Sequence, residues 1–152
     1  MLYSHFLVDD GHFVIPAECI TEIIPCVSIK KQSSLPGYVA GLMNYHGDTI
    51  SVIDLSMLLI GKASKKKLST RIIIINGADV NRKKLMFGLM AEKATDMVNI
   101  DESSFKPPML SDKEALIEGD VAIFDDDLMT RISISEIIKK INKKLFVGKI
   151  ES

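Results

Sequence analysis

Ala17-Glu18-Cys19-Ile20-Thr21-Glu22-Ile23-Ile24 has a second version in this chain, since residues 91–98 read Ala-Glu-Lys-Ala-Thr-Asp-Met-Val. An alanine, a glutamate, a threonine and an acidic residue recur at the same places in both. After each copy the chain reaches a glycine, Gly41 or Gly119, and then runs through short apolar stretches to a closing segment, 52–59 or 131–138. A short internal repeat marks the architecture of a fold. The sequence therefore predicts two related β-rich units, whose shared apolar and acidic positions suggest a surface for partners.

The composition is typical of a folded protein that does not depend on disulfides or bound metals. The chain has 152 residues, 47% of them hydrophobic and 26% charged, with a net charge of −1. This size buries enough surface to fold without disulfides or metals, so Cys19 and Cys26 are expected to stay reduced. No apolar run reaches the roughly 20 residues of a membrane span, and residues 1–8 lack the features of a secretory signal. We expect a cytoplasmic protein that neither inserts into membranes nor binds nucleic acid.

Strands dominate the predicted secondary structure. Short Ile- and Val-rich runs are bounded by turn residues at the spacing typical of a sandwich or of small barrels. The run 71–75 lacks alternation, which predicts a central strand covered on both faces. Residues 17–24 are expected to begin as a helical turn and then extend toward 27–29. The remaining predicted strands are 2–8 and 12–16, joined as a hairpin, 49–54, 85–91, and 116–124 with 128–134, joined about Asp125-Asp126-Asp127.

Two segments have a helical pattern. Asp54 or Ser56 is expected to begin a short helix that Gly61 ends. A C-terminal helix is predicted over about 135–147, with an apolar face of Ile137, Ile138, Ile141 and Leu145 opposite several lysines. A basic amphipathic helix can lie on a membrane, but docking on its own domain is the favoured interpretation. Residues 62–70, which include Lys65-Lys66-Lys67, are interpreted as a solvated connecting loop rather than a phosphate site.

Catalytic and metal-binding patterns are missing from the sequence. The cysteines do not lie at sharp glycine-flanked turns, and His5 and His12 fall in a predicted strand hairpin. The histidines and cysteines lack the spacing of zinc ligands, and residues 125–127 lack the alternating ligands and distal glutamate of a calcium loop. We therefore predict a protein that is not an enzyme and that holds no cofactor and no metal.

One longer segment resembles a known family signature. Residues 35–55 read Leu35-Pro36-Gly37-Tyr38-Val39-Ala40-Gly41-Leu42-Met43-Asn44-Tyr45-His46-Gly47-Asp48-Thr49-Ile50-Ser51-Val52-Ile53-Asp54-Leu55. This order is similar to the pattern of the CheW-like coupling domains of bacterial chemosensory systems. The strand 71–75 and Phe87-Gly88-Leu89-Met90-Ala91-Glu92 also fit, and the resemblance extends over most of residues 5–138. The motif Asn-Tyr-x-Gly is more similar to that of couplers in accessory, biofilm-type pathways than to that of flagellar couplers.

The resemblance implies an all-β fold of two five-stranded Src-homology-type β-barrels that share a core, with short helices and the C-terminal helix. It implies one domain over 1–152, with subdomain one at about 8–70 and subdomain two at about 71–138 plus the N-terminal strand. Two positions depart from the family pattern. His46 replaces an arginine, so that a permanent donor becomes a mostly neutral imidazole. Ser51 replaces a proline and restores a backbone donor, which we expect to alter a strand edge.

The implied function is that of a non-enzymatic adaptor. It would couple the cytoplasmic tip of a methyl-accepting receptor to the regulatory domain of a CheA-type histidine kinase, at membrane receptor arrays. We expect receptor binding in a groove between the two barrels, formed by Ile20, Glu22, Met43, Asn44 and His46. An exposed apolar barrel end would meet the kinase, without assigned residues. The alternative is a CheW-like module that senses a small molecule or sequesters a kinase without receptors.

Overall fold

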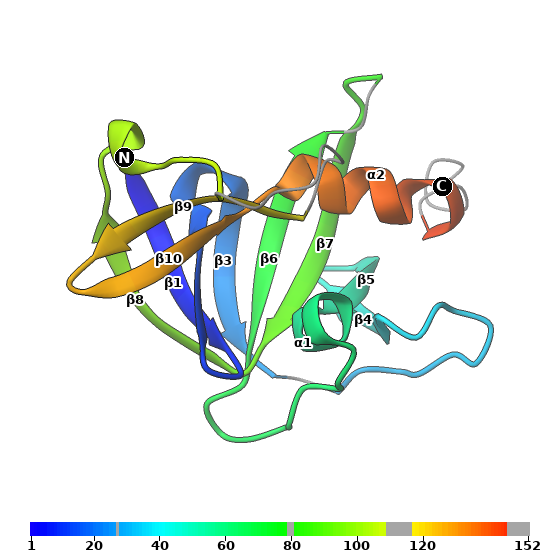
Figure 1. Cartoon of the computed structure of the whole chain (residues 1–152). Helices are drawn as coiled ribbons and strands as arrows, with labels where there is room; N and C mark the ends of the chain where they lie inside the picture. The colour runs from blue at the N-terminus through cyan, green and yellow to red at the C-terminus, as the bar shows by residue number, and fades with distance from the viewer. Residues whose placement is uncertain (27, 79–80, 109–116, 146–152) are drawn as a thin grey trace.

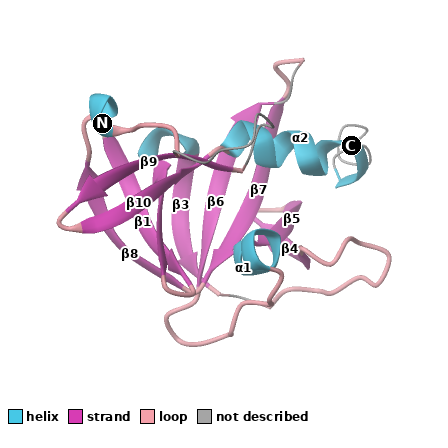
Figure 2. Cartoon of the chain, viewed as in Figure 1, coloured by secondary structure: helices cyan, strands magenta, loops and turns pink. Residues whose placement is uncertain are grey.

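The computed structural model describes the whole chain except residues 27, 79–80, 109–116 and 146–152. Two five-stranded sheets make up most of the fold, and the helices are few and short (Figure 2). One sheet has the order β8-β1-β2-β10-β9, and the other has the order β3-β6-β7-β5-β4. The strands are β1 (Leu2–Val8), β2 (Gly11–Pro16), β3 (Ile20–Pro25), β4 (Val39–Tyr45), β5 (Asp48–Asp54), β6 (Arg71–Ala78), β7 (Lys84–Ala91), β8 (Lys93–Asn99), β9 (Glu118–Phe124) and β10 (Asp127–Ile132).

The internal repeat appears in the fold as two sheets with the same plan. β3 and β8, which contain most of the two repeated stretches, each form the edge strand beside a hairpin, β6–β7 or β1–β2. Each hairpin then pairs in parallel with a second antiparallel pair, through β5–β7 in one sheet and β2–β10 in the other. Each sheet thus combines strands from both halves of the chain. The division into subdomains at about residue 70 stays a prediction.

A shared core lies between the two sheets, and each sheet also has an apolar cluster of its own. The predicted central strand β6 serves two of these clusters. Its side chains alternate between the shared core, which takes Ile73 and Ile75, and the interior of its own sheet, which takes Ile72 and Ile74. All four are completely buried. The expectation of a strand covered on both faces is confirmed, and the common core of the two units is confirmed with it.

The predicted barrels are not closed by hydrogen bonds along the strands. Within the described residues, β3 and β4 are the edges of one sheet and β8 and β9 are the edges of the other. Short segments and side chains cover part of these edges instead. Lys30 exchanges backbone hydrogen bonds with Leu42 of β4, and Lys106 does the same with Val121 of β9. The prediction of five strands in each unit is confirmed. The prediction of closed barrels is wrong, because the bridges at Lys30 and Lys106 are isolated and do not extend the pairing of the strands.

Helices form where the sequence predicts them. The carboxylate of Asp54 accepts from the backbone N–H groups of Ser56 and Met57 at the start of α1 (Leu55–Ile60), and Gly61 follows its end. The helix α2 (Ile134–Leu145) buries Ile137, Ile138 and Ile141 in the shared core, so the expected docking is confirmed. Its predicted residues 146–147 lie outside the described chain. The 3₁₀ turn η1 (Ala17–Cys19) precedes β3 as expected, and β3 ends at Pro25, before residues 27–29.

Candidate functional site

The tight turn between β4 and β5 places His46 at the surface. Tyr45 pairs with Asp48, so that His46 and Gly47 are the two turn residues, with φ angles of 50° and 90°. Positive φ at both positions is the geometry of a hairpin turn that matches strand twist. The side-chain carbonyl of Asn44 accepts the Gly47 N–H at 2.9 Å and holds the turn. As a result, the His46 side chain is 76% exposed.

A single carboxylate joins this turn to the opposite edge of the sheet. The Tyr45 hydroxyl donates to Glu22 Oε1, and Nε2 of His46 lies 3.5 Å from the same oxygen. The rings of Tyr45 and His46 meet edge to face, with centroids 4.4 Å apart. Glu22 is on β3 and Tyr45 ends β4, which are the two edge strands of this sheet. The sheet therefore curls far enough for side chains to connect edges that share no backbone pairing.

An open hollow of about 620 Å³ lies beside this contact. Its lining combines the charged and polar groups of the turn with apolar side chains from both edges. Met43 is almost fully buried in the cluster inside the sheet, whereas Glu22 and Asn44 are exposed. The lining residues are Glu22, Ile24, Ser28, Met43, Asn44, Tyr45 and His46. We call this feature the edge hollow.

The hydrogen bond from Tyr45 favours the ionised form of the edge-hollow carboxylate. The tyrosine hydroxyl lowers the pKa of Glu22 more than any other neighbour does, burial opposes this effect, and His46 adds to the lowering. The same hydrogen bond raises the pKa of Tyr45. A hydrogen bond to the charged form of a carboxyl favours that form. The edge hollow thus presents a carboxylate beside an exposed imidazole.

Four of the five predicted site residues come together in this hollow, and Ile20 does not. Ile20 packs against the shared core from the start of β3. The hollow also lies on one sheet, whereas we expected a groove between the two barrels. Such a groove exists separately as a smaller hollow of about 170 Å³, lined by Ser4, Ile23, Arg71, Ala94, Asp96 and Met97. Sequence periodicity could not distinguish the two hollows, because residues of β3 line both of them.

Tyr45 also lines the edge hollow, although it was not among the predicted site residues. The buried positions of β4 are Val39, Gly41, Met43 and Tyr45. This alternation along the strand is the sequence signal that could have identified Tyr45. The expected effect of Ser51 on a strand edge was wrong. β5 lies between β7 and β4, so Ser51 is a buried residue inside the sheet, opposite Leu42.

The other residues considered for chemistry have ordinary surroundings. His5 and His12 stack and share a hydrogen bond of 2.8 Å, and burial lowers the pKa of His5. Cys19 and Cys26 are both half-buried. In the part of the chain that the structure describes, no three His, Cys, Asp or Glu residues are arranged to hold a metal ion. No helix there has the length and apolar character required to cross a membrane.

Comparison with known proteins places this arrangement in a family. The chain is 27% identical over 137 residues to the chemotaxis protein CheW of Helicobacter pylori (strain ATCC 700392 / 26695), covering 89% of this chain and 79% of that protein. Its fold is similar to the crystal structure of the scaffolding protein TtCheW from Thermoanaerobacter tengcongensis, with a TM-score of 0.77 and 24% identity, over 90% of this chain and 86% of that one. The family model of the CheW-like domain matches residues 3–142. The chain therefore belongs to the CheW-like domain family.

Proposed function

We propose that this protein is a non-enzymatic adaptor that couples methyl-accepting chemoreceptors to a CheA-type histidine kinase. The match to the CheW-like domain over residues 3–142 is the observation that carries this proposal. The names of the two relatives, a chemotaxis protein and a scaffolding protein, support the same role. The adaptor acts in the cytoplasm and is recruited to receptor arrays. Its kinase contact has no assigned residues.

The edge hollow is the proposed receptor site. Glu22, Asn44 and His46 supply exposed polar groups around the nearly buried Met43, and such a mixture of an apolar base and a polar rim is typical of protein interfaces. The carboxylate is held by Tyr45 and therefore meets a partner in one orientation. A receptor tip that offers a basic or hydrogen-bond-donating side chain beside an apolar one fits this arrangement.

Binding of the two partners tests the proposal. The purified protein is mixed with a receptor cytoplasmic tip and with the regulatory domain of a CheA-type kinase, and both affinities are measured by calorimetry. We expect binding to both partners and a ternary complex. Absence of binding to either, together with a ligand-dependent rise in melting temperature, would instead support a small-molecule sensor.

Glu22→Lys tests the receptor site within that experiment. Reversing a charge that faces a partner places like charges together, so receptor affinity should fall at least tenfold while kinase affinity is unchanged. Glu18→Lys is the matched control, because Glu18 is an exposed acid on η1 that does not line the edge hollow. A large fall in melting temperature with unchanged receptor affinity would make Glu22 a structural residue.

A further inference from the structure

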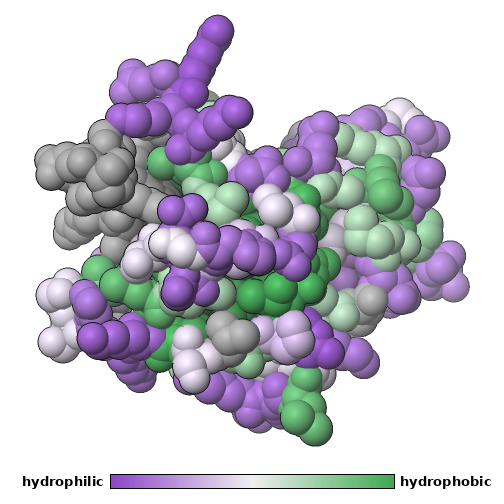
Figure 3. Space-filling model, turned by 180° about the vertical axis from the view of Figure 1, so that it is seen from behind, coloured by the Kyte–Doolittle hydropathy of each residue, from purple (hydrophilic) through white to green (hydrophobic). Residues whose placement is uncertain are grey.

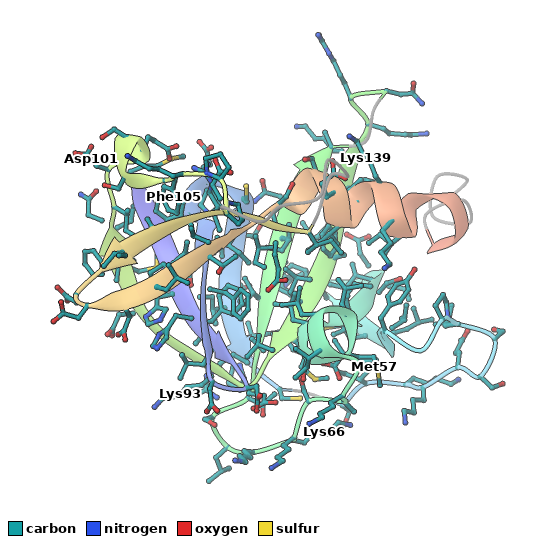
Figure 4. All side chains as sticks on the ribbon, viewed as in Figure 1. Met57, Lys66, Lys93, Asp101, Phe105 and Lys139 are labelled. Atoms are coloured by element: carbon teal, nitrogen blue, oxygen red, sulfur yellow. The ribbon has the colours of Figure 1, made fainter. Side chains whose placement is uncertain are left out.

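The loop between α1 and β6 combines strong positive charge with a fully exposed apolar side chain. Leu68 is 99% exposed. Figure 4 shows Lys66 on this loop at the lower edge of the molecule. In the described part of the chain, the loop lysines form no ion pair with an acidic residue. We call this segment, residues 61–70, the basic loop, and its exposed lysines are Lys62, Lys65, Lys66 and Lys67.

The backbone of the basic loop is held in place. The buried carboxylate of Asp54 accepts from the backbone N–H of Ser64 at 2.8 Å and from its hydroxyl at 2.6 Å. The buried hydroxyl of Thr70 accepts from the Lys67 N–H and donates to the Lys65 carbonyl, both at 2.9 Å. A loop whose backbone is fixed in this way loses little backbone entropy on docking. That property suits a folded partner better than a fluid membrane surface.

The same chain carries a surface of complementary character. The turn between β9 and β10 contains Asp125 and Asp126 and is followed by Asp127, all exposed. Ile123 and Leu128 face each other across this hairpin and are 73% and 57% exposed. We call residues 123–128 the acidic hairpin end. Figure 1 shows it at the left tip of the molecule, away from α2, β4 and β5.

We propose that two copies of this chain associate by docking the basic loop of one on the acidic hairpin end of the other. Lysines 65–67 meet aspartates 125–127, and Leu68 covers the pair formed by Ile123 and Leu128. The contact removes three exposed apolar side chains from water and brings opposite charges together. Because the loop and the hairpin end are both small, the contact is weak and sensitive to salt. This association is separate from the proposed coupling of receptors to a kinase.

Charge reversal tests the contact with the protein alone. One variant carries Lys65→Glu, Lys66→Glu and Lys67→Glu, and a second carries Asp125→Lys and Asp126→Lys. Sedimentation velocity at low salt should show self-association of the wild type that weakens in 0.5 M salt, as screening requires. Each variant alone should associate at least tenfold more weakly, and an equimolar mixture of the two should associate again, since the reversed loop fits the reversed hairpin.

Lys31→Glu, Lys84→Glu and Lys106→Glu together form the matched control, because they change net charge equally at exposed positions outside the basic loop. This control should associate like the wild type, and thermal melting should show that all variants are folded. A wild type that stays monomeric at millimolar concentration overturns the proposal, as does association that survives reversal of the loop. Co-sedimentation of a monomeric wild type with phosphatidylglycerol vesicles would assign the basic loop to a membrane instead. No receptor or kinase is present, so these results leave the proposed function untouched.

Discussion

Each sheet ties its strands together through a tyrosine that donates to a glutamate beside a basic side chain. The two clusters are Tyr45, Glu22 and His46 on the sheet of β3–β7, and Tyr3, Glu102 and Arg131 on the other sheet. In the second cluster the arginine lies 2.8 Å from Glu102, donates to Tyr3 and stacks over Phe105 at 4.3 Å. Its side chain is 26% exposed, whereas that of His46 is 76% exposed.

The difference separates a structural cluster from one that is open to a partner. Arg131 carries a permanent charge and uses its planar group on several neighbours at once, which fixes β10 against β1 and the 3₁₀ turn η2 (Glu102–Ser104). His46 projects from a turn and lies 3.5 Å from Glu22. Figure 3 shows that hydrophobic side chains also reach the surface on the back of the molecule, so exposure alone does not mark the site. The edge hollow is distinguished by an exposed imidazole beside an oriented carboxylate.

One glycine follows each repeated stretch, and replacing it by alanine should cost very different amounts of stability in the two sheets. This is the largest difference that we expect between them. Gly41 has a φ of +153°, and a Cβ there would lie 2.5 Å from Ile29 Cγ2 and from the Lys30 carbonyl oxygen. Gly41→Ala should therefore lower the free energy of unfolding by about 3 kcal/mol, through strain and overpacking. At Gly119 the nearest atom is the Arg131 carbonyl oxygen at 3.0 Å, so Gly119→Ala should cost about 1 kcal/mol or less. Urea denaturation measures both, and equal losses would contradict the contrast.

Removing the basic side chain from each cluster should separate stability from binding. Arg131→Met should lower the free energy of unfolding by about 1–2 kcal/mol, at the low end for charged hydrogen bonds because Glu102 and Asp120 are partly solvated. His46→Ala should leave the unfolding curve unchanged within error. The two variants are compared by urea denaturation and by titration with a receptor tip. Weaker receptor binding by Arg131→Met without loss of stability would show that the second cluster is also a binding site.

His46→Arg makes the edge hollow resemble the other cluster in charge. An arginine keeps its charge at every physiological pH, so it should bind an acidic receptor tip roughly three- to tenfold more tightly at pH 8, a modest gain because the position is exposed. Titration of both proteins with the receptor tip at pH 8 measures this effect. If the substitution leaves the dissociation constant unchanged, His46 only packs against Tyr45.

Removing the tyrosine hydroxyl from either cluster should change how the melting temperature falls at acid pH. This is the smallest of the expected effects. The pKa values of Glu22 and Glu102 are lowered from 4.5, mainly by Tyr45 and Tyr3. A lowered pKa in the folded state adds stability above pH 4.5 that is lost as the pH falls through the folded value. Tyr45→Phe and Tyr3→Phe should each raise the pKa of the partner carboxyl and flatten the fall of melting temperature below that pH. NMR titration of the glutamate carboxyls provides the measurement, and an unchanged pKa would exclude the hydrogen bond as its cause.

Features set by neighbouring residues were predicted well. Asp54 and Gly61 bracket α1 because a capping carboxylate and a left-handed C-terminal residue act within one helical turn. The run 71–75 reads as a strand buried on both faces because each isoleucine needs an apolar neighbour whatever its partner strand is. The hairpins 2–16 and 118–132 followed from their turn residues in the same way.

Sequence alone therefore determined the β-rich units, the two ends of α1, the buried central strand and four of the residues that meet in the edge hollow. Tertiary structure decided which hairpin joins which sheet, that the sheets stay open, and that Tyr45 reaches Glu22. Local patterns report the burial and turn preferences of single residues, whereas contact between β3 and β4 depends on how far a whole sheet twists and curls. That curvature is the sum of packing across two apolar clusters, and no short segment of the chain encodes it.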